Sequence, residues 1–454
     1  MSAPILSARP LPVRFQYSTP PQAAWLAPWR GGKTGSGVVT LFDLLRGAEC
    51  YAPEPLGRQD VLIAGGFVAR VAPHIAPERG ILPDLRVHDL HGRILVPGFI
   101  DMHVHIAGGG GEGGYQHRTP PIEPRALGPH GTTGVVGLLG TDGVTRSVAD
   151  LLAEARRLTA LGLTADIFTG AYQLPTRTLT GSVRSDLVFL PEVLGAGEIA
   201  IADDRGSHPS GHDLVGIGAE VRVGALLAGK KGILHIHVGD GRRRLEALRQ
   251  ALRRSALPED LFSATHLNRN GDLYAEAADL TRMGAYADVT AGIFPAPGDL
   301  RPVDPAEALA DLLHRGHPER VTMSSDGQGS SPVFDQQGRL VGLGIGQASR
   351  LHWALRRAVL KHGAPLELAL AAVTSHVAAA LGLPRRGRIT AGGAADLVVL
   401  DDNLDVHEVF ARGRLCARDG QWLLPDPFQP EAAAKGLRRL AKTRSRSPGG
   451  AYGS

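Results

Sequence analysis

The stretch PGFIDMHVHIAGGGGEGG, residues 97–114, combines a short apolar strand, two histidines and a glycine-rich loop. His103 and His105 are two residues apart, and alternate side chains of a strand point to the same face. Two neutral imidazoles on one face are good ligands for zinc or a similar divalent ion. A bare His-x-His pattern also arises by chance on surfaces, but the apolar strand before it and the glycine-rich loop after it favour a metal site.

Seven further strand-like segments follow, and amphipathic helical stretches such as residues 148–162 and 243–255 lie between them. Apolar strands that alternate with helices predict parallel strands covered by helices. Eight such units in residues 98–387 predict an α/β fold, a (β/α)8 barrel of the TIM type. The segments are residues 98–106, 133–140, 165–172, 197–203, 232–240, 261–268, 286–292 and 320–326.

Short alternating runs with Gly and Pro breaks flank the barrel region on both sides, which is a strand and hairpin signal. Residues 38–97 and 388–428 are therefore predicted to form one small β-sandwich domain that the chain leaves and later completes. Residues 1–37, rich in Pro, Gly and Ser, are predicted to be a disordered N-terminal extension. Residues 429–454 are predicted to be a disordered basic tail.

The formal net charge of +4 is unevenly distributed along the chain. Residues 1–40 carry +4 and residues 429–454 carry +5, so residues 41–428 carry about −5. This distribution gives no reason to expect a nucleic-acid partner. The two cysteines match neither a disulfide scaffold nor a thiolate metal site, and no apolar run approaches the ~20 residues that span a bilayer. We expect a cytoplasmic protein with no membrane partner.

Further donor side chains occur at the ends of later strand segments. His237, His266 and Asp326 each stand near the end of a predicted barrel strand. Catalytic groups of such barrels come from several strand ends at the C-terminal face. With His103 and His105, these donors exceed what one structural zinc requires. They suit two metals that share a bridging ligand and a hydroxide, with Asp326 placed to take the hydroxide's proton.

At this point the chain resembles the amidohydrolase superfamily and, within it, the β-aspartyl (isoaspartyl) dipeptidases. The resemblance runs from about Leu41 to Phe428. It rests on the blocks PGFIDMHVHIAGGGGEGG, TTGVVGLLGTD, TGAYQLPTRTLTGSV, THLNRN and RVTMSSDGQGS. It implies hydrolysis of β-aspartyl dipeptides to aspartate and an amino acid by a metal-bound hydroxide. It also implies a homo-oligomer.

The resemblance implies two divalent metal ions, with zinc as the expected metal, although imidazole and carboxylate ligands also suit cobalt, manganese or nickel. His103 and His105 would bind the more buried ion with Asp326. His237 and His266 would bind the second. Asp326 would pass a proton to the leaving amine, and Tyr172 would stabilise the oxyanion. For Tyr172, a role at the edge of the core is the alternative.

The substrate would bind through charged side chains. The resemblance implies that Glu112 receives the α-ammonium of a β-aspartyl dipeptide, and that Arg205 and Arg269 bind its carboxylates. These residue types fit, because carboxylates pair ammonium groups and a guanidinium binds a carboxylate through two parallel hydrogen bonds. A solvated loop acid and surface ion pairs are the alternatives. Lesser substrate contacts implied by the resemblance are Thr141, Ser330 and the Gly110 backbone.

The bridging ligand departs from the family pattern. The best-known members use a carboxylated lysine on the fourth strand, but this chain has no lysine between Lys33 and Lys230. The family's lysine stands seven residues before its arginine, and that spacing from Arg205 leads to Glu198. A glutamate offers the same two oxygens without modification. We therefore expect Glu198 to bridge the metals, with no carboxylated lysine.

One geometric difficulty accompanies this expectation for Glu198. Its carboxylate carbon lies three bonds from Cα, whereas that of a carboxylated lysine lies six bonds away. Either the strand backbone must come closer or the metals must move. The alternative makes Glu198 a buried acid that supports the ligands, with one metal weakly held or absent.

Two other functions compete with the dipeptidase. An amidohydrolase that acts on a cyclic amide or an N-acyl amino acid could use the same metals, but many such substrates lack the ammonium that Glu112 would bind. A catalytically silent scaffold should have lost metal donors, and here they remain. His235 shares a face with His237, but the family has an apolar residue there. We predict a supporting or core role for it.

Overall fold

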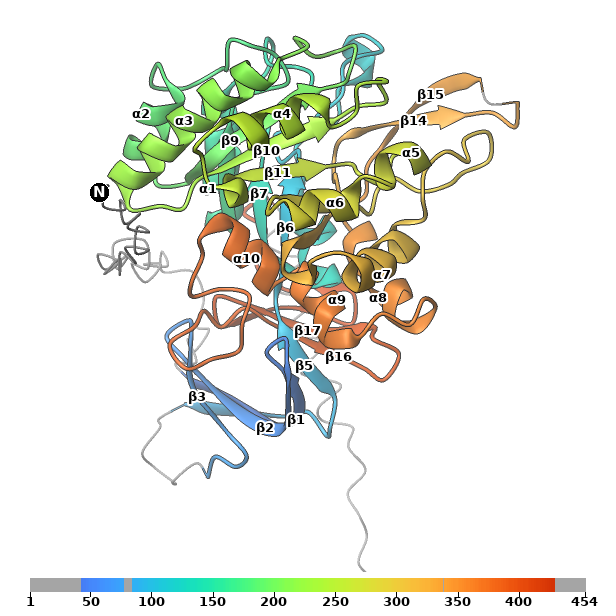
Figure 1. Cartoon of the computed structure of the whole chain (residues 1–454). Helices are drawn as coiled ribbons and strands as arrows, with labels where there is room; N and C mark the ends of the chain where they lie inside the picture. Colours follow the sequence, from blue (N-terminus) through green and yellow to red (C-terminus); the bar gives the residue numbers. More distant parts are fainter. Residues whose placement is uncertain (1–41, 77–83, 338, 429–454) are drawn as a thin grey trace, which may run out of the picture. The chain divides into compact units, whose positions relative to one another are not determined.

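The computed structural model describes residues 42–76, 84–337 and 339–428. Within them, eight consecutive parallel strands form one sheet (Figure 1). Hydrogen bonds from Asp326 N to His103 O, 3.1 Å, and from His105 N to Gly327 O, 2.9 Å, join its two outer edges just beyond the last strand. The predicted barrel is therefore confirmed. Its strands are β6 (Phe99–Val104), β7 (Thr132–Gly137), β8 (Thr164–Thr169), β9 (Val193–Ile201), β10 (Ile233–Val238), β11 (Phe262–Thr265), β12 (Tyr286–Thr290) and β13 (Val321–Ser324).

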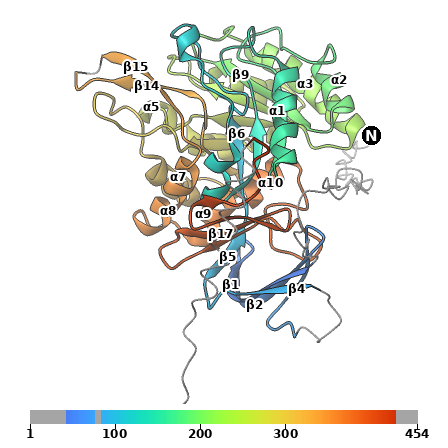
Figure 2. The same cartoon turned by 180° about the vertical axis from the view of Figure 1, so that it is seen from behind.

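Helices follow the strands and cover the outside of the barrel (Figures 1 and 2). The strands are buried almost throughout, as expected for a parallel sheet with both faces covered. Side-chain caps mark the starts of several helices, and Ser147 accepts a hydrogen bond from Asp150 N at the start of α1. The helices are α1 (Val148–Ala160), α2 (Val183–Phe189), α3 (Gly211–Ala228), α4 (Glu246–Arg254), α5 (Gly271–Tyr274), α6 (Ala277–Arg282), α7 (Pro305–Arg315), α8 (Arg350–Leu360), α9 (Leu366–Ala372) and α10 (Ser375–Leu381).

A second sheet unites segments from before and after the barrel. The two groups of strands meet where β5 pairs antiparallel with β16, Leu95 opposite Val399. Leu45, Val61 and Phe410 also belong to its buried core. Its strands are β1 (Phe42–Tyr51), β2 (Pro55–Ala64), β3 (Phe67–Ala72), β4 (Leu85–Asp89), β5 (Ile94–Pro97), β16 (Leu397–Leu400), β17 (Val406–Ala411), β18 (Arg414–Arg418) and β19 (Gln421–Trp422). The predicted terminal segments, 1–37 and 429–454, lie outside the described residues.

An antiparallel hairpin that the sequence did not lead us to expect extends from the barrel a few residues after Asp326 (Figure 1). It consists of β14 (Ser330–Phe334) and β15 (Leu340–Ile345), with Ser331 opposite Gly344. Because Ser330 is its first residue, the hairpin begins at the edge of the predicted site. In the described part of the chain, no helix is long and apolar enough to cross a membrane.

Candidate active site

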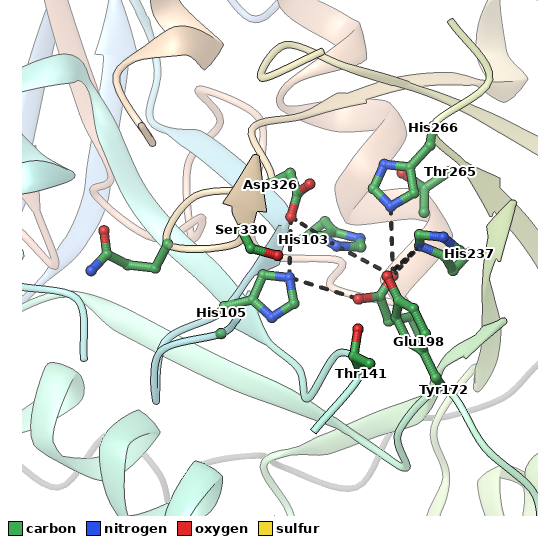
Figure 3. A network of polar contacts seen from close by, with 12 residues as sticks. His103, His105, Thr141, Tyr172, Glu198, His237, Thr265, His266, Asp326 and Ser330 are labelled. Atoms are coloured by element: carbon green, nitrogen blue, oxygen red, sulfur yellow. Dashed lines mark hydrogen bonds and ion pairs between the residues drawn. The ribbon is translucent and has the colours of Figure 1, made fainter. Parts of the chain in front are cut away.

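The two histidines of the first barrel strand point to one place in the barrel mouth (Figure 3). His103 lies in β6 and His105 directly follows it, and both are buried. His103 Nε2 lies 3.5 Å from the Asp326 carboxylate, and His105 Nε2 lies 3.1 Å from the same oxygen. Asp326 follows β13, the strand next to β6 around the closed barrel. His103, His105 and Asp326 therefore come together because β6 and β13 meet where the barrel closes.

The Glu198 carboxylate faces all four predicted histidine ligands (Figure 3). Its side chain is fully buried on β9. Burial alone would raise the pKa of this carboxyl, but the charge and hydrogen bonds of the surrounding imidazoles hold it well below its usual range. The nitrogen-to-oxygen distances are 3.1 Å from His237 Nδ1, 3.5 Å from His103 Nε2, 3.6 Å from His266 Nε2 and 3.7 Å from His105 Nε2.

A bulge in β9 brings this glutamate close to the imidazoles. Leu234 of β10 pairs with Ala196 and Ile236 pairs with Ile199, so Gly197 and Glu198 together stand opposite the single residue between them. A Cβ on Gly197 would lie 2.8 Å from the Cβ of His235 and 2.9 Å from its carbonyl oxygen. Only glycine permits this approach of the two backbones. The bulge gives a physical route by which a short carboxylate reaches the site.

The donor set fits divalent metal ions. His103 Nε2 and Glu198 Oε1 are buried and have no hydrogen-bond partner among the described residues. Ligand atoms of His103, Glu198 and His266, and separately of His103, His105 and Asp326, lie within 4.8 Å of one another. Burial, with a smaller effect from the His237 charge, lowers the pKa of His266 to about 3, so its imidazole is neutral and able to bind a metal.

The predicted ligand Asp326 and the neighbouring Tyr172 have the protonation states that hydrolysis needs. Burial opposes ionisation of Asp326, but the close imidazoles of His103 and His105 lower the pKa of this carboxyl well below its usual value. Asp326 is therefore ionised and can accept a proton. Burial, followed by the Glu198 charge, raises the pKa of Tyr172 well above its ordinary value. Its phenol is therefore a hydrogen-bond donor, and its Oη lies 2.8 Å from His237 Nδ1.

The predicted substrate-binding residues gather above the ligands around a cavity of about 480 Å³. Glu112 accepts hydrogen bonds from the hydroxyls of Thr141, 2.9 Å, and Ser330, 3.0 Å. Arg205 Nη1 lies 3.3 Å from the same carboxylate. Gly110 has a φ of +69°, and a Cβ there would lie 2.5 Å from a backbone oxygen, so this loop requires glycine.

Arg269 lines the same cavity. Its Nε is buried and has no hydrogen-bond partner among the described residues. A buried guanidinium nitrogen without an acceptor is costly, and a ligand carboxylate would satisfy it. Glu112, Arg205 and Arg269 thus line one cavity together with the predicted metal ligands His105, His237 and Asp326. Its other charged lining residues are Asp142, Arg146, Asp203, Asp204, Asp240 and Arg301.

Two residues outside the predicted ligand set contact the ligands, and of these only the second, Asp203, was not anticipated in the sequence. His103 Nδ1 lies 2.9 Å from His235 Nε2, so His235 supports a predicted ligand, as a buried histidine that shares the barrel interior can. Asp203 lies 2.9 Å from His237 Nε2 and also accepts hydrogen bonds from Arg205. The only sequence signal for Asp203 was an acid at a strand end, two residues before Arg205.

Comparisons with known proteins identify the class. A family model described as "Amidohydrolase family" matches residues 237–412. A crystal structure of beta-aspartyl dipeptidase from Fervidobacterium islandicum AW-1, in complex with beta-Asp-Leu dipeptide, is 35% identical with a TM-score of 0.77. The match covers 86% of this chain and 99% of that chain. The chain belongs to the amidohydrolase family.

Within this family the chain is similar to the beta-aspartyl dipeptidase of Fervidobacterium, and a second structure of that enzyme is 33% identical with a TM-score of 0.76. The match covers 85% of this chain and 100% of that one. Dihydropyrimidinase from Brevibacillus agri, 17% identical with a TM-score of 0.60 over 84% of this chain and 96% of that one, shares the fold.

Curated relatives found by sequence have other activities. A dihydroorotase from Solibacter usitatus is 33% identical over 149 residues, 32% of this chain and 30% of that protein. An adenine deaminase from Roseobacter denitrificans is 25% identical over 429 residues, 88% of this chain and 61% of that protein. The chain thus spans less than two thirds of the length of these two relatives. These relatives therefore do not identify its substrate.

Proposed function

We propose that this chain hydrolyses β-aspartyl dipeptides to aspartate and a free amino acid. The observation that carries the proposal is the charge arrangement of the cavity, in which Glu112, Arg205 and Arg269 surround the predicted metal ligands. A β-aspartyl dipeptide has one ammonium and two carboxylates, and these three side chains offer one partner for each. The similarity to the beta-aspartyl dipeptidase that was crystallised with beta-Asp-Leu supports the same substrate class.

Two divalent ions would be held by His103, His105, His237, His266 and Asp326, with Glu198 as the bridging carboxylate. Bound there, such ions would activate water and polarise the amide carbonyl. Support for the bridging role comes from the contacts of Glu198 with all four imidazoles. Zinc is the metal we propose, because imidazole and carboxylate donors suit it.

The side chains around the ligands would divide the remaining tasks. Glu112 would hold the α-ammonium, and the two arginines would hold the carboxylates. Tyr172 would donate a hydrogen bond from its phenolic hydroxyl to the carbonyl oxygen as negative charge develops there. Asp326 would accept a proton from the attacking water and pass it to the leaving amine as the C–N bond breaks. One water is consumed, and the two amino acids are released.

A pair of isomeric peptides tests the proposal. Metal-replete protein should hydrolyse β-Asp-Leu and leave α-Asp-Leu intact. In the α-linked isomer the carbon that bears the ammonium is bonded directly to the scissile carbonyl, whereas in the β-linked isomer a methylene separates them. Dihydroorotate, hydantoin and adenine, assayed in parallel, represent the cyclic substrates of related enzymes. Turnover of one of these in place of β-Asp-Leu would replace the proposal with that activity.

We also propose a cytoplasmic location and self-association. Both cysteines are free and buried, which suits a reducing compartment. Phe189 of α2 is 70% exposed and Leu227 of α3 is 68% exposed, and association between copies could cover such side chains. Light scattering tests the second point, and a monomer at micromolar concentration would contradict it.

A further inference from the structure

One side chain just after β9 contacts both a predicted metal ligand, His237, and a predicted substrate-binding residue, Arg205. Asp203 follows β9 by two residues, and its side chain is 4% exposed. One carboxylate oxygen lies 2.9 Å from His237 Nε2 and 2.7 Å from Arg205 Nη2. The other accepts hydrogen bonds from Nε and the backbone N–H of Arg205, both 2.9 Å. Four contacts therefore fix this carboxylate between the two groups.

The contact determines which nitrogen of His237 can bind a metal. A carboxylate only accepts hydrogen bonds, so Asp203 requires the N–H of a metal-binding imidazole on Nε2, and the Tyr172 hydroxyl, 2.8 Å from Nδ1, can donate to the other nitrogen. Nδ1 then keeps its lone pair, and this is the nitrogen that lies 3.1 Å from Glu198. The two carboxylates thus hold opposite edges of the same ring.

The same contact places the Arg205 guanidinium over the cavity. Nε and Nη2 face Asp203, and Nη1 is left to point toward Glu112, 3.3 Å away. The guanidinium also stacks on Tyr172, 5.4 Å from its ring centroid. Because Asp203 occupies one edge of the fork, Arg205 can offer only its remaining edge to a substrate.

Glycines after β10 make room for this arrangement. A Cβ on Gly239 would lie 2.5 Å from the carbonyl oxygen of Ala202 and 2.6 Å from the Cβ of Asp203. Gly241 donates to the Ala202 carbonyl at 2.7 Å, and a Cβ on it would lie 2.6 Å from that oxygen. The motif HVGDG, residues 237–241, therefore begins with the predicted metal ligand His237. Its two glycines leave the space that the loop with Asp203 occupies.

We propose that Asp203 is a positioning residue that couples the metal-binding nitrogen of His237 to the substrate-binding guanidinium of Arg205. The substrate half of this inference rests on the proposed function, and the metal half does not. Loss of the carboxylate should disturb both groups together. An asparagine in its place has one accepting oxygen, which cannot serve the imidazole and the guanidinium in the same way.

The test compares Asp203→Asn with Asp402→Asn, an exposed aspartate in the C-terminal part of the chain. Zinc dissociation constants come from competition with a chelating dye, and KM and kcat for β-Asp-Leu are measured at saturating zinc. Asp203→Asn should weaken one of two zinc sites about 10- to 100-fold, the range for side chains that support metal ligands. It should also raise KM at saturating zinc, and Asp402→Asn should change neither.

Two further variants separate a positioning role from a structural one. Arg205→Lys should raise KM and leave both zinc constants unchanged. Gly239→Ala should displace the Asp203 loop and reproduce both effects, which matters if Asp203→Asn folds poorly. Unchanged zinc constants in Asp203→Asn would overturn the coupling, and so would an unchanged KM. If wild-type protein does not hydrolyse β-Asp-Leu, the proposed function fails, but the zinc constants still decide the role of Asp203 toward His237.

Discussion

Replacing Glu198 by glutamine removes one negative charge from the centre of the ligand cluster and leaves the side chain almost the same size. The carboxylate is fully buried and lies within 3.7 Å of all four imidazoles. A neutral amide offers one weaker oxygen donor and an NH2 group that cannot bind a metal. We expect the variant to fold and to lose metal.

The expected loss of metal affinity follows from the direct role of Glu198 among the ligands. Loss of side chains that merely support a ligand weakens metal binding about 10- to 100-fold. Glu198 contacts the ligands directly, so one of two ions should bind at least about 100-fold more weakly, which corresponds to ~2.8 kcal/mol. Wild type and variant are saturated with zinc, freed of excess metal by gel filtration and measured by mass spectrometry. The wild type should retain two ions per chain, and Glu198→Gln should retain one or fewer. The matched control is Glu220→Gln on α3, where the glutamate pairs with Arg184 outside the cavity.

Two results would refute this reasoning. If Glu198→Gln retains two tightly bound ions, Glu198 is not a bridge. Glu198→Lys tests the geometry in addition, because a carboxylated lysine would reach three bonds further than glutamate. The glutamate carboxylate already contacts the imidazoles, so the longer side chain should not fit. Restoration of two ions and activity by Glu198→Lys in bicarbonate would contradict the close approach of the β9 backbone.

Three further predictions concern stability and reactivity. Gly197→Ala should lower the free energy of unfolding in urea by about 1–3 kcal/mol, because its Cβ would meet His235. The control Gly216→Ala should raise it slightly, because nothing lies within 4 Å of the added Cβ. Equal effects of the two substitutions would contradict the close packing of β9 on β10. Burial lowers the pKa of His352, so this imidazole contributes stability that is present above about pH 6.5 and lost as the pH falls below it. His352→Gln should therefore lose less unfolding free energy than wild type between pH 7.5 and 5.5. Burial, with a smaller effect of the Glu49 charge, raises the pKa of Cys50 to about 12, so neither buried thiol should react with a disulfide reagent at pH 8 until urea unfolds the chain.

The clustering of the predicted ligand side chains could be anticipated from the sequence because its signals are local. A His-x-His pair on an apolar strand and donors at the ends of later strands indicate five candidate ligands. These are His103, His105, His237, His266 and Asp326. The count of eight alternating strand and helix units predicted the barrel equally directly. Glu198 required more, since only its spacing from Arg205 in a family pattern distinguished it from other buried acids.

The remaining features depend on contacts between distant segments. The bulge that advances Glu198 exists because β9 has one residue more than β10 in their paired stretch, and no property of GEIAIAD alone reveals it. Asp203 is adjacent to Asp204 in sequence, and only the fold shows that the first is buried against His237 and the second is exposed. The β14–β15 hairpin was missed because its short alternating runs follow directly on a barrel strand.

The most direct test of the account is a crystal structure of the zinc-loaded protein with anomalous diffraction data on both sides of the zinc absorption edge. We predict two anomalous peaks in the barrel mouth, each within about 2.2 Å of a different oxygen of Glu198. A single peak, or two peaks with neither Glu198 oxygen at coordination distance, would contradict the bridging glutamate and with it the proposed metal centre.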